Sequence, residues 1–200
     1  MRPLCWLDTE TTGLSAQKHE IIEFAAVRET DGAEICFKIQ PQHIETAHPK
    51  ALEVNGYTEE AWSLAITPEE AVERIILFAQ GCEMAPMYAG HNVSFDWRHL
   101  QSLFERVGRI DEWPFHYHSV DTMTLAREHL KPLGQRSISL DALCNTLGIS
   151  NEGAHTALAD VRRTMAVWNK LERATWLNRL RWKHRIQKLN RAADAEKGKE

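Results

Sequence analysis

The order of apolar and polar residues along the chain predicts strands first and alternating strands and helices later. The apolar segments with β-compatible residues are 3–8, 21–29, 34–40, 85–89 and 116–120. The first three follow one another closely and predict an antiparallel meander. Because the later two alternate with helical segments, the whole pattern predicts an α/β fold, a mixed sheet covered on both faces.

Helical periodicity and end signals predict six helical segments. The predicted helices are 49–55, 68–80, 94–107, 122–129, 139–147 and a last one that begins near 155 and continues, with a break, to about 191. Gly56 directly follows the first helix, as is common at helix ends. Thr67 and Pro68 begin the second helix, with a capping side chain and a proline suited to the first turn. The small and charged residues 192–200 are expected to form a frayed tail.

The composition is that of a globular domain, with 43% apolar and 26% charged residues among 200. No run of eighteen apolar residues exists, which excludes a membrane-spanning helix, and no export signal is visible, so we expect a cytoplasmic protein. The four cysteines are far apart in sequence and form no C-x-x-C motif. We therefore expect reduced thiols, and neither zinc ligands nor disulfides.

The net charge of −4 conceals an asymmetry between two parts of the chain. Residues 1–160 carry 12 basic and 24 acidic side chains, a net charge of −12. Residues 161–200 carry 12 basic and 4 acidic side chains, a net charge of +8. An acidic body is suited to metals and a basic end to an anionic polymer.

Two acids stand at the end of the first apolar segment. Asp8 and Glu10 are two residues apart, so on a strand their side chains point to the same face. Two negative charges there repel each other and lose their contact with water, which is unfavourable unless a bound cation offsets the charge. Because Mg²⁺ and Mn²⁺ prefer oxygen ligands, the pair predicts a divalent metal site. For such a pair alone, the alternative is two solvated acids at a strand end.

Two further acids and a histidine are candidates for the same site. Asp96 lies in the first turn of the helix that follows segment 85–89, and Asp160 lies early in the last long helix. Four carboxylates can hold two divalent ions about 3.5–4 Å apart, which stabilises both oxygens of a phosphoryl displacement. His155 lies five residues before Asp160, and histidine, with an ordinary pKa of about 6.5, suits a general base.

Three motifs at these residues occur in order: D-T-E-T-T-G-L at 8–14, H-N-x-x-F-D at 91–96 and H-x-A-L-x-D at 155–160. Together they resemble the DEDD exonucleases of the histidine subtype, the group that includes the proofreading subunit of bacterial DNA polymerase III. The resemblance covers about residues 3–170, and its five family positions are filled by Asp8, Glu10, Asp96, His155 and Asp160. One departure is His99, where proofreading subunits more often carry an aromatic residue. With Arg98 beside it, this segment looks closer to stand-alone exonucleases.

The resemblance implies a ribonuclease H-like fold with a five-stranded mixed sheet, and 3′→5′ hydrolysis that releases nucleoside 5′-monophosphates. It also implies two Mg²⁺ ions, for which Mn²⁺ can substitute, with Asp8 between the ions. Glu10, Asp96 and Asp160 would complete the ligand set, and His155 would take a proton from the attacking water.

Several residues around the acids are candidates for substrate contact: Thr9, Thr11, Thr12, Leu14, His91 and Asn92. The first four match positions where relatives cradle and wedge the last nucleotide. The other two order the loop before the third acid. Asp121, which follows segment 116–120, either caps a helix or supports the site from behind.

The C-terminal helix carries basic side chains interleaved with apolar ones. The candidates for substrate contact there are Arg179, Arg181, Lys183 and Arg185. The alternatives are phosphate contact, a solubilising surface, and an interface for a homodimer or an acidic polymerase or repair partner. Apolar residues at loose helical spacing predict a packing face of this helix: Trp168, Leu171, Trp176, Leu177, Leu180, Trp182, Ile186 and Leu189.

These observations predict an exonuclease domain over residues 1–170, with residues 171–200 as a basic helical extension and tail of the same domain. We expect the substrate to be DNA, bound at single-stranded or frayed 3′ ends. One alternative is an exoribonuclease of the same superfamily, since no residue in the sequence decides whether the site accepts or excludes a 2′-hydroxyl. The other is a catalytically silent module that recruits a partner through its C-terminal helix.

Overall fold

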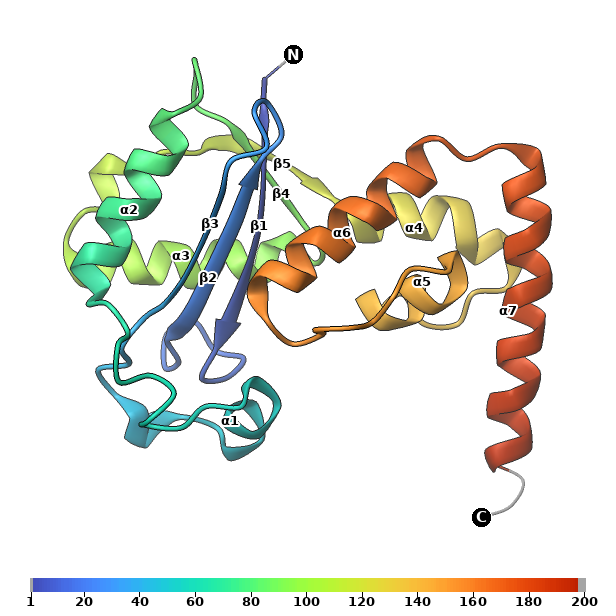
Figure 1. Ribbon diagram of the computed structural model, residues 1–200, viewed down its shortest axis with the longest axis horizontal. Coiled ribbons are helices and arrows are strands. Elements are labelled where there is room, and N and C mark those ends of the chain that lie inside the picture. Colours follow the sequence, from blue (N-terminus) through green and yellow to red (C-terminus); the bar gives the residue numbers. More distant parts are fainter. Residues whose placement is uncertain (1, 198–200) are drawn as a thin grey trace.

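The computed structural model describes residues 2–197 and shows a five-stranded sheet with helices on both faces (Figure 1). The strands are β1 (Leu4–Thr11), β2 (Ile21–Arg28), β3 (Glu34–Lys38), β4 (Met87–Gly90) and β5 (His116–Asp121). Their order in the sheet is β3-β2-β1-β4-β5. β1, β2 and β3 pair antiparallel, whereas β4 pairs parallel with β1 and with β5. The predicted mixed α/β sheet is confirmed.

The helices are α1 (Pro49–Asn55), α2 (Pro68–Gln80), α3 (Val93–Val107), α4 (Thr122–Leu130), α5 (Leu140–Leu147), α6 (Ala157–Glu172) and α7 (Trp176–Lys197). Short 3₁₀ helices are η1 (Ile44–Thr46), η2 (Ile110–Glu112) and η3 (Lys131–Leu133). The predicted end signals are confirmed: Gly56 adopts a left-handed conformation after α1, and Thr67 accepts a hydrogen bond from the Glu70 amide at the start of α2.

β1 is the central strand and continues further than predicted. It runs three residues past the expected end at Asp8, because its pairing with β2 continues to Thr11, which lies opposite Ile21. Asp8 and Glu10 therefore lie within a hydrogen-bonded strand. Backbone pairing with β2 fixes their position in the sheet, so these two acids do not lie on a flexible loop.

The two faces of the sheet have different cores. α2 and α3 cover one face, where the core includes Leu7, Phe24, Ile75, Leu100 and Phe104. α6 covers the other face, and its Ala157 and Val161 pack against a surface that includes Ala25 and Ala89. Small side chains at this contact let the helix approach the sheet closely. The start of α6 is thereby held beside β1.

α7 lies beyond α6 and packs on α4, α5 and η3 (Figure 1). Trp182 and Ile186 are buried there, as predicted, but Trp176 is 69% and Leu180 is 55% exposed, so the prediction of one continuous packing face is wrong. Both of these exposed side chains lie in the first half of the helix. Since α4, α5 and η3 cover only part of its circumference, the rest of α7 faces solvent.

The expected frayed tail is also wrong for residues 192–197, which continue α7. Arg136 forms two hydrogen bonds with the carboxylate of Asp194, at 2.6 and 3.0 Å. Asn190 donates to the carbonyl oxygen of Gly134 at 3.1 Å. These contacts hold the last turns against the segment before α5. The rest of the expected tail, residues 198–200, lies outside the described residues.

All four cysteines are free thiols, as expected. Cys5 and Cys144 are buried, whereas Cys36 is exposed. In the described part of the chain, no helix combines the length and the apolar character needed to cross a membrane.

Asp121 joins the starts of two helices. Its carboxylate accepts hydrogen bonds from the Met123 amide in α4 at 2.8 Å, and from the Asn92 and Val93 amides at the start of α3 at 3.1 and 3.2 Å. The cap predicted for this residue is confirmed. The same carboxylate also binds the start of the helix that carries Asp96, and its support of a functional site stays a prediction.

Replacing Asp121 with Ala is expected to lower the free energy of unfolding by about 2 kcal/mol, because three backbone donors lose their acceptor. Chemical denaturation measures this loss. Asp111→Ala serves as the control, since Asp111 is exposed and makes no side-chain hydrogen bond or ion pair within residues 2–197. Equal stability of the two variants would contradict the role of Asp121.

Candidate active site

Three carboxylates converge where β1 meets α6. Asp8 and Glu10 come from the second half of β1, and Asp160 comes from the first turn of α6. Each offers an oxygen within 4.8 Å of those of the other two. All three side chains are partly buried. The packing of α6 on β1 brings these carboxylates together, and their spacing in the sequence alone does not predict it.

Asp96 lies beside this group and is bound to the same strand. It is 3% exposed in the first turn of α3, and its Oδ1 accepts hydrogen bonds from the amide and the hydroxyl of Thr9, at 3.0 and 2.8 Å. It lies outside the group of three whose oxygens meet within 4.8 Å. The predicted fourth acid is therefore a neighbour of the group, with one oxygen committed to β1.

Burial and mutual repulsion make these acids hard to ionise. Burial raises the pKa of Asp8 well above its usual range, and the charges of Asp96, Asp160 and Glu10 raise it further. Burial, together with the charge of Asp160, raises the pKa of Glu10 to about 7. Burial raises the pKa of Asp96 to about 7, although the hydrogen bonds from Thr9 lower it. Such a group of oxygen donors fits divalent cations, which would offset its charge.

Glu23 is a fifth acid that the sequence analysis missed. It lies on β2 directly opposite Glu10 in the sheet, and it is 8% exposed. Its charge raises the pKa of both Asp8 and Glu10. The available signal was a single acid inside the apolar segment 21–27, where an unpaired charge is costly.

The sequence analysis also missed Arg163, which forms a hydrogen bond with Asp160 and so fixes the position of its carboxylate. Its guanidinium is 5% exposed and donates to Oδ1 of Asp160 at 2.6 Å, to Asp141 of α5, and to Asn151 at 2.8 Å. Arg163 thus joins α6, α5 and the loop that leads to His155. It also lowers the pKa of Asp160, against the effect of burial. Its spacing of three residues from Asp160 on one helix was the signal in the sequence.

His155 lies in the turn before α6, and its side chain is exposed. Its backbone has a φ of 70°, a left-handed conformation that is uncommon for residues other than glycine. The ring is close enough to Asp160 that a positive charge on it lowers the pKa of that carboxyl group. An exposed histidine at the edge of buried acids is placed to exchange protons with water.

The loop after β1 presents Leu14 to solvent. Thr12 and Glu20 close the base of this loop, through backbone and side-chain hydrogen bonds of 2.8 and 2.9 Å. The Thr11 hydroxyl donates to the carbonyl of Gly13 at 2.9 Å. Leu14 is 85% exposed at the tip. A rigid loop with an exposed apolar side chain suits the predicted wedge, which stays a prediction.

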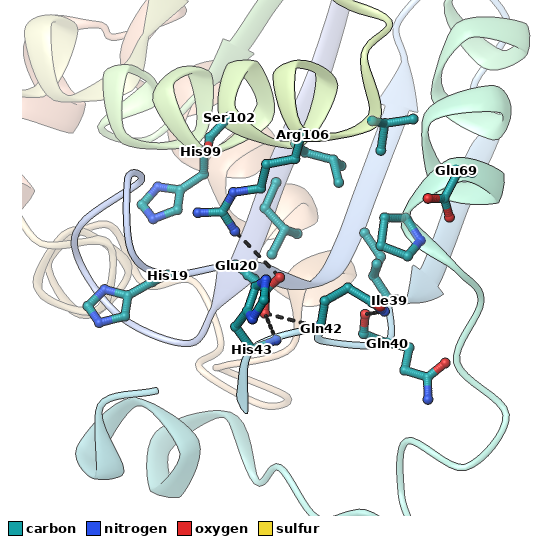
Figure 2. Close-up of a pocket in the computed structure, with 14 residues that line it drawn as sticks. His19, Glu20, Ile39, Gln40, Gln42, His43, Glu69, His99, Ser102 and Arg106 are labelled. Atoms are coloured by element: carbon teal, nitrogen blue, oxygen red, sulfur yellow. Dashed lines mark hydrogen bonds and ion pairs between the residues drawn. The ribbon is translucent and has the colours of Figure 1, made fainter. Parts of the chain in front are cut away.

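A cavity of about 440 Å³ lies behind this loop, between the loop and α3 (Figure 2). His99, which departs from the family pattern, lines it and is 2% exposed. Ser102 and Arg106 of α3 also line it, and both donate to the carbonyl of Ala16 in the loop, at 2.7 and 3.2 Å. None of the five predicted catalytic residues lines the cavity, so its lining residues support the loop from outside the acidic group.

His91 and Asn92 lie at the start of α3. A ring nitrogen of His91 is 2.7 Å from the Thr122 hydroxyl, which ties the loop to α4. Asn92 is exposed and has a φ of 63°. The ring of His91 orders the loop as expected, whereas the side chain of Asn92 makes no capping hydrogen bond. The contact of both residues with substrate stays a prediction.

The four basic candidates on α7 are not brought to the acids. They are Arg179, Arg181, Lys183 and Arg185, on a helix that packs against α4 and α5. Arg179 is 3.4 Å from a ring nitrogen of His129, and Arg185 donates to the carbonyl of Thr146 at 3.3 Å. Their role in substrate contact stays a prediction.

Comparison with known proteins is consistent with this geometry. The exonuclease family model RNase_T matches residues 5–168. A DNA polymerase III PolC-type protein of Thermotoga petrophila is 34% identical over 165 residues, which are 81% of this chain and 11% of that protein. Ribonuclease T of Photobacterium profundum is 30% identical over 191 residues, which cover 82% of each chain.

The solved structures that resemble this chain include the zinc-ion-bound form of an E. coli ExoI complex with single-stranded DNA. Its TM-score is 0.70 at 25% identity, over 86% of this chain and 41% of that one. The ribonuclease H-like fold and the resemblance to the DEDD exonucleases of the histidine subtype are thereby confirmed. The chain belongs to the exonuclease family.

Proposed function

We propose that this protein is a divalent-metal-dependent 3′→5′ exonuclease that acts on single-stranded or frayed 3′ ends of DNA and releases nucleoside 5′-monophosphates. The observation that carries the proposal is the group of repelling carboxylates on the central strand, with an exposed histidine beside it. Membership of the exonuclease family gives this group its chemical context.

In this mechanism Asp8, Glu10 and Asp160 would hold the metals, and Asp96 would add a fourth carboxylate from α3. Bound divalent ions supply electrostatic stabilisation of the charge that develops on the phosphoryl oxygens. Mg²⁺ is the proposed ion, with Mn²⁺ as a substitute. Arg163 fixes Oδ1 of Asp160, and an oxygen of this carboxylate lies within 4.8 Å of oxygens of Asp8 and Glu10.

The remaining steps belong to residues at the edge of the group. The backbone from Thr9 to Thr12, at the end of β1, would cradle the last nucleotide, and Leu14 would wedge against its base. His155 would take a proton from the attacking water, which then bonds to the terminal phosphorus as the bond to the 3′ oxygen breaks. The exposed position of the ring lets it pass that proton to solvent.

A ribonuclease of the same superfamily is the second candidate. It is supported by the match to Ribonuclease T, of which this chain covers 82%. The two candidates share every residue named above and differ in their contact with the 2′-hydroxyl. Degradation of DNA and RNA of equal sequence decides between them.

Asp8→Asn is expected to reduce the rate of 3′ shortening at least about 100-fold, because the metals lose a buried ligand. The measurement follows a 5′-labelled single strand of DNA, and of RNA, with Mg²⁺, with Mn²⁺ and with EDTA. Asp111→Asn is the matched control and should retain full activity. Metal-independent shortening, or full activity of Asp8→Asn, would contradict the proposal.

Raised carboxyl pKa values also predict a pH-dependent stability of the metal-free protein. Glu10 and Asp96 have a pKa of about 7 in the folded state, above the ordinary range of carboxyl groups. The folded chain therefore holds protons that the unfolded chain releases between about pH 4 and pH 7, and the free energy of unfolding falls as pH rises through this window. Above about pH 7 Glu10 and Asp96 ionise, and their repulsion then opposes folding.

In EDTA at pH 8, Asp8→Asn is accordingly expected to be more stable than the wild type, by on the order of 2 kcal/mol. At pH 5 the difference should shrink. Thermal unfolding at both pH values measures it, and added Mn²⁺ should raise Tm more in the wild type than in the variant. Lower stability of the variant at pH 8 would show that the acids do not repel as described.

Arg163→Gln tests the residue behind Asp160. Without the guanidinium the pKa of Asp160 rises, so the variant should lose most activity near pH 6–7, recover part of it near pH 9, and need about tenfold more Mg²⁺ for half-maximal rate. Arg162→Gln is the neighbouring control, since Arg162 pairs with Glu34 on the surface. Arg163→Lys, which keeps the charge, should restore part of the activity. An equal loss at every pH would indicate a structural role only.

A further inference from the structure

Two adjoining cavities form a basic groove where α5, α6 and α7 meet. Their volumes are about 350 and 710 Å³, and both are lined by Lys170, Asn178 and Trp182. The other residues along the groove are Leu147, Gly148, Asn169, Arg173, Leu180, Arg181, His184 and Arg185. Among residues 2–197, no acidic side chain lines either cavity. We refer to this feature as the α5–α7 groove.

Of the four lysine and arginine side chains that line the groove, two are held by hydrogen bonds to backbone carbonyls and two are not. Lys170 donates to the carbonyl of Leu147 at 3.0 Å, and Arg185 donates to that of Thr146 at 3.3 Å, so both are held at the C-terminal end of α5. Arg173 and Arg181 are exposed, and neither side chain forms a hydrogen bond or ion pair within residues 2–197.

Elsewhere on the surface, some arginines are compensated by acids and others are not. Arg74, Arg109 and Arg162 each pair with a carboxylate, at 2.5 to 2.7 Å, whereas Arg98 and Arg127 are exposed and form no ion pair within residues 2–197. The groove differs from these isolated positions because several cations line it together without an acid among the residues that line it. Its uncompensated positive charge is complementary to a polyanion.

Apolar side chains accompany the charges. Leu180 lines the groove and is 55% exposed, and Trp176, one helical turn earlier, is 69% exposed. An inorganic anion would contact the cationic side chains only and would leave the exposed apolar side chains without a partner. A single strand of nucleic acid presents both phosphates and flat bases, and base stacking on aromatic side chains commonly accompanies phosphate contacts.

The groove is connected to the acidic group through α6. Asp160 lies in the first turn of this helix and Lys170 in its last turn, and ten residues of helix span roughly 15 Å. At about 3.4 Å per nucleotide of a stacked strand, this distance corresponds to roughly four or five nucleotides. α7 lies beyond residues 5–168, which the family model matches, so the groove is built partly by an extension of this chain.

We propose that the α5–α7 groove binds the sugar–phosphate backbone of a single strand several nucleotides upstream of its 3′ end. The proposal rests on the proposed exonuclease function for the position of that end. Of the basic residues of α7, Arg181 and Arg185 contact the strand in the groove. Lys170 and Arg173, which precede α7, contact the same strand. Lys183 does not line the groove.

The test compares two double variants with the same loss of charge. Arg173→Gln with Arg181→Gln removes the free groove cations. Lys188→Gln with Arg191→Gln removes two exposed cations of α7 that line neither cavity. Binding of a labelled 20-nucleotide single strand is measured by fluorescence anisotropy in EDTA, between 50 and 200 mM salt, and circular dichroism checks that each variant is folded.

The groove variant is expected to bind about tenfold more weakly at low salt, and its slope of log affinity against log salt should fall by about 1.4, as two lost phosphate contacts predict. The control variant should bind within about twofold of the wild type. Equal loss in both variants, or none in either, would overturn the proposal. Equally tight binding of polyglutamate of matched charge, with the same loss in the groove variant, would assign the groove to an acidic protein.

A second readout separates this proposal from the proposed function. Hydrolysis of the p-nitrophenyl ester of thymidine 5′-monophosphate by the wild type and by the Lys188→Gln, Arg191→Gln control reports on the acidic group alone, because this substrate is too short to reach the groove. Strand binding without hydrolysis by any variant would refute the nuclease and leave the groove standing. Hydrolysis by the wild type without groove-dependent strand binding would refute the groove and leave the nuclease standing.

Discussion

Repulsion among buried carboxylates is the constraint around which this molecule is arranged. Asp8 and Glu10 are held on the central strand, and Asp96 and Asp160 are brought to them by helices that pack on opposite faces of the sheet. Burial raises the pKa of every one of these acids. The packing of the rest of the domain must offset this unfavourable term, and a bound divalent cation would remove it.

The scaffold holds the acids through contacts that do not themselves carry out chemistry. Asp121 binds the starts of α3 and α4, and Thr9 holds the carboxylate of Asp96. On the other face, Arg163 joins Asp160 to α5 and to the loop before His155. Each of these residues fixes one acid relative to β1. A site of this kind depends on the tertiary structure more than on the rigidity of any one element.

The sequence was sufficient for the strands, most helices and the residues of the motifs, because these depend on local periodicity and on fixed spacings. It did not place Arg163 or Glu23, whose importance depends on what lies opposite them in the tertiary structure. The faces of α7 were mispredicted for a related reason, since Trp176 and Leu180 are apolar but no neighbouring element covers them. Residues 192–197 are helical, with Asp194 bound by the distant Arg136.

The central claim is that the acids on β1 and α6 form a divalent metal site. The most direct measurement is anomalous diffraction from crystals soaked in Mn²⁺ together with a nucleoside 5′-monophosphate. The structure predicts anomalous density bounded by carboxylate oxygens of Asp8, Glu10 and Asp160, and its loss in Asp8→Asn crystals. Absence of density there at millimolar Mn²⁺, or density confined to other residues, would contradict the claim.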